Sequence, residues 1–221
     1  MTKSFISRFT LTQLMLPALR KHKLLGAISF ASLALLLSSC VVGSTLIFSE
    51  RDVKDNPNLV ENPGFDTYSE IPAEALKGWT VQLEPPTVKK NPVSIDTSAS
   101  IEGSNSLKIN ASESSVLILS DSYTVRRYGG YYLRAQMKTD SPLPPVVQLR
   151  FIAFRDDGKI VNRFRKKSRL ETDWHRFTIS AGFIRPGAKF GRLGIFIPPF
   201  KEGSIWIDDL GCYEVHGFKI D

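Results

Sequence analysis

The sequence predicts an all-β fold, a jelly-roll β-sandwich, for most of the chain that follows an apolar N-terminal segment. Apolar and polar residues alternate with a period of two over 131–138, 147–154, 176–180 and 192–197. This period is expected of strands that turn one face toward a core. Turns rich in Gly and Pro separate these stretches, and no long helical stripe follows residue 57. Many short strands with frequent turns favour two packed sheets.

The first 39 residues have the layout of an export signal. Residues 1–39 contain five basic residues and no acidic residue, and no charged residue lies between Leu24 and Phe48. The stretch Leu36-Leu37-Ser38-Ser39-Cys40 resembles a bacterial lipobox. This resemblance implies that residues 1–39 are a lipoprotein signal peptide, preceding the fold as a helix, and that Cys40 carries the lipid, with palmitate among its acyl chains.

An uncleaved membrane helix is the alternative for this segment, because Leu24–Phe48 is long enough to cross a hydrocarbon layer of ~30 Å. Both interpretations tether the domain to a membrane in the cell envelope, outside the cytoplasm. Val41 occupies the position at which an Asp tends to hold lipoproteins at the inner membrane. The lipobox resemblance therefore implies the outer membrane where two membranes are present.

The positive charge of the chain is concentrated in the signal. The whole chain has a formal charge of +7, and removing the five basic residues before Cys40 leaves +2. A nucleic-acid-binding domain usually carries a basic stripe on its folded part. The sequence therefore predicts no nucleic-acid partner.

A basic run lies at Arg163–Arg169. Charges at this spacing are typical of an edge strand that is protected against pairing with another chain. Contact with anionic glycans or with lipid head groups is the alternative.

The mature chain divides into three predicted parts. Residues 40–57 are rich in turn and linker types and predict a tether. Residues 58–216 form the predicted β-sandwich, and residues 217–221 form a tail. Cys212 lies in a strand-like stretch and has no intrachain partner if Cys40 is lipidated, so it is expected to be a small buried core residue.

Motifs at both ends of the predicted domain point to a known family. They are Asn58–Asp66, Gly78-Trp79, 103–109, 172–177 and 205–210. In this order they resemble carbohydrate-binding modules of the cellulose- and xylan-binding, galactose-binding-like jelly-roll group. The resemblance covers nearly all of residues 58–215 and implies a non-catalytic module that binds a polysaccharide.

The same resemblance implies a structural calcium ion where the first and last strands of such modules meet. Asp66 and one of Asp208 and Asp209 are the matching positions, and Ca²⁺ prefers oxygen ligands of this kind. The strand period places Asp208 and Asp209 on opposite faces, which excludes them as a paired acid and base on one substrate. The alternative is that these acids cap turns or solvate the sheet edge.

The predicted sugar site lies on an outward sheet face rather than on the tryptophans. Trp79, Trp174 and Trp206 are expected to fill the core or close its ends, as in the family. In related modules the concave sheet face binds the glycan, and the candidates here are Tyr132, Arg134, Gln136, Gln148, Arg150 and Phe196. These residue types offer aromatic faces to sugar C–H groups and polar donors to hydroxyls. An ordinary solvated sheet face is the alternative.

Signatures of catalysis are missing from the sequence. The histidines His22, His175 and His216 do not have metal-ligand spacing, and no Gly-x-Ser-x-Gly motif occurs. We therefore predict a membrane-anchored, extracytoplasmic lipoprotein that binds a poly- or oligosaccharide without catalysis. The alternative is a structural or interaction module that docks onto a protein partner in an envelope complex and has no sugar site.

Overall fold

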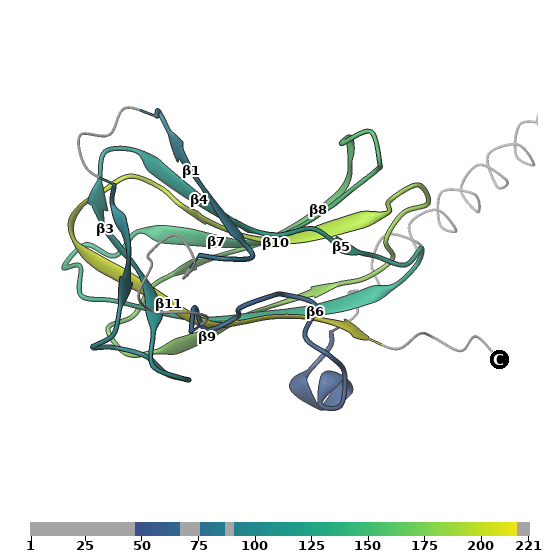
Figure 1. Cartoon of the computed structure of the whole chain (residues 1–221), viewed down its shortest axis with the longest axis horizontal. Coiled ribbons are helices and arrows are strands. Elements are labelled where there is room, and N and C mark those ends of the chain that lie inside the picture. The colour runs from purple at the N-terminus through teal and green to yellow at the C-terminus, as the bar shows by residue number, and fades with distance from the viewer. Residues whose placement is uncertain (1–46, 67–75, 87–90, 216–221) are drawn as a thin grey trace, which may run out of the picture. The chain divides into compact units, whose positions relative to one another are not determined.

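The computed structural model describes residues 47–66, 76–86 and 91–215 (Figure 1). The predicted signal peptide, Cys40 and the predicted tail lie outside these ranges. None of the helical segments within them has the length and hydropathy that a membrane span requires.

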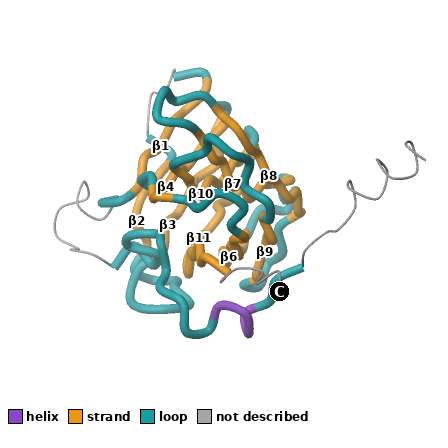
Figure 2. Tube along the Cα trace, turned by 90° about the vertical axis from the view of Figure 1, so that its right-hand side faces the viewer, coloured by secondary structure: helices purple, strands orange, loops and turns teal. Residues whose placement is uncertain are grey.

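The described chain forms two antiparallel sheets that face each other. Sheet A has the strand order β2-β3-β11-β6-β9, and sheet B has the order β1-β4-β10-β7-β8, with the short β5 paired to β10 (Figure 2). The strands are β1 (Trp79–Glu84), β2 (Val93–Asp96), β3 (Ser106–Ser112), β4 (Ser115–Ser120), β5 (Tyr123–Thr124), β6 (Gly130–Thr139), β7 (Val146–Phe154), β8 (Ile160–Arg169), β9 (His175–Ala181), β10 (Phe190–Ile197) and β11 (Phe200–Val215). The predicted all-β sandwich is confirmed, and all four alternating stretches are strands.

The apolar set of each strand fills the space between the sheets. Leu133, Ala135 and Met137 of β6 are completely buried. Across the sandwich, the Tyr131 ring stacks on the Phe151 ring with centroids 5.3 Å apart. The core therefore joins the two sheets through the residues that the period-two pattern selects.

Cys212 lies in this core, as the sequence predicts. Its side chain is completely buried, and burial raises the pKa of the thiol to about 12. A thiol that stays protonated and inaccessible is a packing residue rather than a nucleophile.

An N-terminal strap, residues 47–57, lies on the outward side of sheet A (Figure 2). It contains the short 3-10 helix η1 (Glu50–Val53), and Val53 is buried. The Phe48 N–H donates to Ser180 Oγ at 2.8 Å. These residues belong to the predicted tether 40–57, so the tether prediction is wrong from residue 47 onward. Burial of Val53 and the contact to β9 make the strap part of the domain.

The motif that begins at Asn58 ties the chain to β11. The Asn58 side-chain oxygen accepts from the N–H groups of Val60 and Cys212 at 3.1 and 3.0 Å. Its amide donates to the Leu210 carbonyl at 3.0 Å. Asn58 therefore satisfies backbone groups of both segments, which explains the need for an amide side chain at this position.

Candidate functional site

The six predicted sugar-binding residues do not share one face. Tyr132, Arg134 and Gln136 lie on β6 in sheet A, whereas Gln148, Arg150 and Phe196 lie on β7 and β10 in sheet B. Outward residues of the two sheets point to opposite sides of the sandwich. The prediction of a single face is therefore wrong, because the chain passes from one sheet to the other between β6 and β7.

The sheet A candidates lie beneath the N-terminal strap. Tyr132 and Gln136 are only 3% and 7% exposed. With its amide oxygen turned toward Arg176, Gln136 accepts from Nε and Nη2 of that residue at 3.1 and 3.0 Å. Residues covered in this way offer little surface to a polymer, so this half of the predicted site is part of the scaffold.

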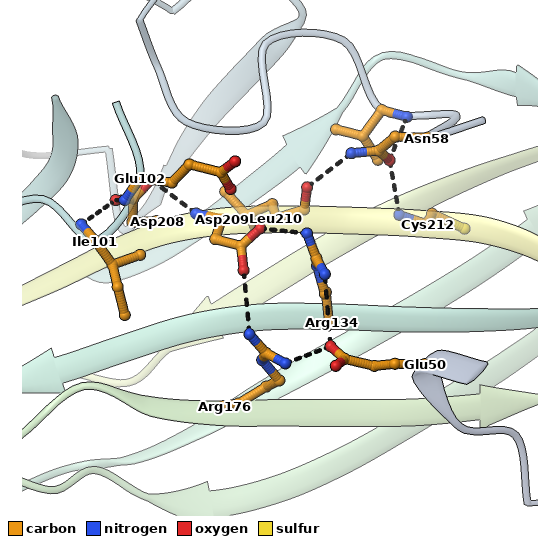
Figure 3. A network of polar contacts seen from close by, with 11 residues as sticks. Glu50, Asn58, Ile101, Glu102, Arg134, Arg176, Asp208, Asp209, Leu210 and Cys212 are labelled. Atoms are coloured by element: carbon orange, nitrogen blue, oxygen red, sulfur yellow. Dashed lines mark hydrogen bonds and ion pairs between the residues drawn. The ribbon is translucent and has the colours of Figure 1, made fainter. Parts of the chain in front are cut away.

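Arg134 belongs to a closed network of charges (Figure 3). Its Nη2 donates to Asp209 Oδ1 at 2.6 Å, and its Nη1 lies 3.5 Å from Glu50 Oε1. Arg176 contacts the same Glu50 oxygen and lies 3.7 Å from Asp209 Oδ2. Burial works against the charged form of Arg134, but the Asp209 charge raises the pKa of the guanidinium overall. The network fastens η1 to sheet A and neutralises its own charges.

Asp208 and Asp209 are both on the outward side of sheet A, so the prediction of opposite faces is wrong. The pairing of β11 with β6 shifts between Asp208 and Gly211, and Asp209 has a φ of 46°. This bulge interrupts the strand period and turns the Asp209 carboxylate toward Arg134. A left-handed residue at a bulge cannot be predicted from alternation alone.

Asp208 is a buried acceptor of backbone N–H groups. Its carboxylate accepts from Ile101 and Glu102 at 2.7 and 3.2 Å and from Asp209 at 2.7 Å. Burial, with the nearby charge of Asp66, raises the pKa of Asp208 despite these three hydrogen bonds. Asp208 therefore attaches the loop before β3 to β11. Its carboxylate also lies near the carboxylate of Asp66.

Asp66 faces Asp208 across Gly64. A Cβ on Gly64 would lie 2.9 Å from Asp66 Oδ2 and 3.4 Å from Asp208 Oδ1. The other Asp66 oxygen accepts from the N–H groups of Ser104 and Asn105 at 2.8 and 3.0 Å. Two carboxylate oxygens that converge on one point fit a hard cation such as Ca²⁺. Asp209, which faces two arginines, does not fit as a third ligand, and no group of three His, Cys, Asp or Glu suited to a metal occurs in the described ranges.

Trp79 is the tryptophan that fills the core as predicted. It is 7% exposed, and its Nε1 donates to the Asn62 carbonyl at 3.0 Å. Trp174 and Trp206 are half-buried on the outward side of sheet A, with Lys138 Nζ 5.1 and 5.2 Å from their ring centroids. For these two the core prediction is wrong, because Trp206 occupies an outward position between the buried Ile205 and Ile207.

The three sheet B candidates form one contiguous cluster. Phe196 pairs with Gln148, and Gly194 pairs with Arg150, on neighbouring strands. The Arg150 guanidinium lies over the Phe196 ring, 4.3 Å from its centroid. Its Nε and Nη2 donate to Gln148 Oε1 at 3.2 and 3.0 Å. An aromatic face, an amide and a guanidinium are therefore presented together, and each is partly exposed.

Further residues missed by the sequence analysis extend this cluster across sheet B. Leu117 of β4 pairs with Phe196 and with Gln82 of β1. The alternation in 79–84 gives the signal that Gln82 points outward, but only the strand order places it beside Phe196. The sheet is bowed, with β1 and the β7-β8 hairpin raised on either side of β10 (Figure 1). The outward side of sheet B is thus its concave side.

Comparison with known proteins gives matches at the level of solved structures. No family model matches the chain, and no curated protein matches it in sequence. A family 61 carbohydrate-binding module in complex with β-1,4-galactotriose matches with a TM-score of 0.52 at 15% identity, over 71% of this chain and 98% of the module. The CBM22-1 xylan-binding domain of Paenibacillus barcinonensis Xyn10C matches with a TM-score of 0.50 at 12% identity, over 73% of this chain and 97% of that domain.

An enzyme is also among the matches. An arabinose-bound GH51 α-L-arabinofuranosidase matches with a TM-score of 0.55 at 13% identity, over 71% of this chain. The match spans 26% of the enzyme chain. The two modules, in contrast, are matched over almost their whole length. The described chain therefore has the β-sandwich fold of carbohydrate-binding modules.

Proposed function

We propose that this protein binds a poly- or oligosaccharide on the outward side of sheet B, without catalysing a reaction on it. The observation that carries the proposal is the cluster of Gln148, Arg150 and Phe196. A sugar ring can lie its C–H groups on an aromatic face while amide and guanidinium groups bond its hydroxyls. The three side chains provide these functions but no nucleophile and no general acid.

The structural matches support this proposal. One matching structure is a family 61 module in complex with β-1,4-galactotriose, and another, the CBM22-1 domain, is named as xylan-binding. Fold alone does not give function, so the support is the combination of this fold with the sugar-compatible cluster on the concave sheet.

Phe196→Ala is expected to weaken glycan binding about tenfold, because it removes both the ring face and the surface on which Arg150 rests. Affinity electrophoresis measures the effect, in gels that contain a neutral or anionic polysaccharide on which the unaltered protein is retained. The matched control is Trp174→Ala, which removes an outward aromatic side chain from sheet A. Loss of retention by Trp174→Ala but not by Phe196→Ala would overturn the placement on sheet B. Absence of retention of the unaltered protein on a broad glycan panel would favour a protein-docking role.

We also propose a structural calcium ion held by Asp66 and Asp208. A cation there would neutralise two carboxylates whose oxygens converge beside Gly64. It would stabilise the junction between the N-terminal motif and β11. This proposal leaves Asp209 out of the ligand set, since both of its oxygens face arginines.

We further propose that the chain is a lipoprotein anchored through Cys40 in the cell envelope, at the outer membrane where two membranes are present. The support is the apolar run and the lipobox-like sequence at its end. Metabolic labelling with a palmitate analogue is expected to mark the unaltered protein and to leave Cys40→Ala unlabelled. Equal labelling of both would contradict lipidation and leave the uncleaved helix as the anchor.

A further inference from the structure

Strand β8 carries a ladder of basic side chains along one side. Arg163, Arg165, Lys167 and Arg169 occupy every second position. Phe164, at an alternate position, packs toward the core with its ring centroid 6.1 Å from that of Phe151. The four basic side chains therefore point to the outward, concave side of sheet B.

The ladder continues onto the neighbouring strands. Arg165 pairs with Arg150 of β7, and Arg163 pairs with Ile152, which in turn pairs with Arg192 of β10. We call this set the basic face; its members are Arg150, Arg163, Arg165, Lys167, Arg169 and Arg192. It flanks the Phe196 side chain on the β7-β8 side of the same concave surface.

The positive charges of the basic face are not neutralised within the described ranges. None of the ion pairs there involves a member of the basic face. Glu84 shares the outward side but lies on β1, at the opposite edge of the sheet. This contrasts with sheet A, where Asp209 and Glu50 neutralise the arginines.

Two members of the basic face, Arg150 and Arg192, are in environments that are unfavourable for a charged guanidinium. Burial, together with the charges of Arg165 and Arg163, lowers the pKa of Arg150. Arg192 Nε is buried and has no hydrogen-bond partner among the described residues; the same is true of Arg134 Nε in sheet A, but there carboxylates neutralise the guanidinium charge. Like charges held together, with a buried donor unmatched, are costly unless an anion completes the site.

We propose that the ligand of sheet B is an anionic polysaccharide, a polymer with carboxylate or sulfate groups along its chain. The proposal rests on the glycan-binding function above and specifies its chemistry. The polymer would lie along β8, where charged donors recur at intervals of ~7 Å over a length of ~20 Å. A single small anion would use only one or two of them.

The same surface favours a polysaccharide over a lipid bilayer or a nucleic acid. A planar bilayer would meet β1 and the raised β7-β8 hairpin before it reached the central part of the sheet (Figure 1), where β7 and β10 carry Arg150 and Arg192. Base stacking in nucleic-acid binding uses several exposed aromatic platforms. Here Phe196 lies beside the aliphatic side chain of Leu117, which suits the C–H face of a sugar. The rings of Phe154 and Phe190 on the same side pack against each other, with centroids 5.8 Å apart.

The test compares polymers that share a backbone but differ in charge. The full chain is titrated with polygalacturonate and its neutral methyl ester, and with dextran sulfate and dextran, at low ionic strength. We expect binding of at least one anionic member and of neither neutral partner. Arg163→Gln/Arg165→Gln is expected to weaken that binding about tenfold, since it removes two neighbouring cationic donors of the β8 ladder. Both positions are exposed on an edge strand, so the variant is expected to fold.

The matched control is Arg51→Gln/Lys54→Gln, which removes the same charge from the strap on the other side of the sandwich. An equal loss in this control would overturn the proposal, because the effect would then be non-specific. Retention on neutral galactan or xylan that Arg163→Gln/Arg165→Gln does not change would also overturn it, while leaving glycan binding intact. Binding only to phosphatidylglycerol vesicles or to a DNA duplex would reject both this proposal and the glycan-binding function.

Discussion

Replacement of Asp208 by alanine is expected to lower the free energy of unfolding by about 3 kcal/mol or more, because three backbone N–H groups lose a charged acceptor. The side chain is completely buried. Asp208→Asn keeps one side-chain oxygen as acceptor and removes a charge that faces Asp66, so its expected cost is about 1 kcal/mol. Urea unfolding in the presence of a chelator measures both variants.

The control for this series is Asp173→Ala, an exposed acid before β9, with an expected change within about 0.5 kcal/mol. An Asp208→Ala variant as stable as Asp208→Asn would contradict the role of the backbone hydrogen bonds. Repeating the unfolding with added Ca²⁺ tests the metal proposal separately. We expect Ca²⁺ to stabilise the unaltered protein but not Asp208→Asn. Equal stability of the unaltered protein in Ca²⁺ and in chelator would remove calcium from the site.

Arg134→Met is expected to destabilise the fold by about 3 kcal/mol, because it leaves the Asp209 carboxylate buried without its nearest counter-charge. Asp209 is 6% exposed, and the remaining contact to Arg176 is 3.7 Å long. Asp209→Asn keeps a residue type that tolerates its φ of 46°. The double variant is expected to cost less than the sum of the two single variants, since it removes the uncompensated charge.

This double-mutant cycle is completed by measuring the free energy of unfolding of both single variants and of the double variant, by heat and by urea. Glu50→Gln serves as the control at the solvent-exposed end of the same network. Its side chain is 45% exposed, so we expect a loss below about 1 kcal/mol. Strict additivity of Arg134→Met and Asp209→Asn would show that the two residues do not act as a pair.

Much of the fold could be predicted from the sequence because strand periodicity is a local property. The buried sets of β7 and β9 follow the alternation residue by residue, whereas β6 also buries the outward Tyr132 and Gln136. Cys212 could be placed in the core for the same reason. The division of strands between two sheets is non-local, so the sequence placed β6 and β7 side by side, although they belong to different layers.

The candidate site was therefore predicted only in part. Gln148, Arg150 and Phe196 do form a cluster, because β7 and β10 are neighbours in sheet B. The coverage of Tyr132 by the strap could not be foreseen, since the polar residues of 47–57 look like a linker. Alternation also cannot reveal the bulge at Asp209, because this bulge depends on the φ of a single residue.

If the chain is anchored and binds a glycan as proposed above, the N-terminal strap would also determine where pulling force enters the domain. Ile47, at the start of the strap on the sheet A side, is 83% exposed, whereas Phe196 points outward from sheet B. A tether attached before Ile47 and a polymer held by sheet B would therefore load opposite layers of the sandwich. Tension between them would pass through the hydrophobic core and the Arg134 ion pairs, so these contacts would set the mechanical resistance of the protein under load.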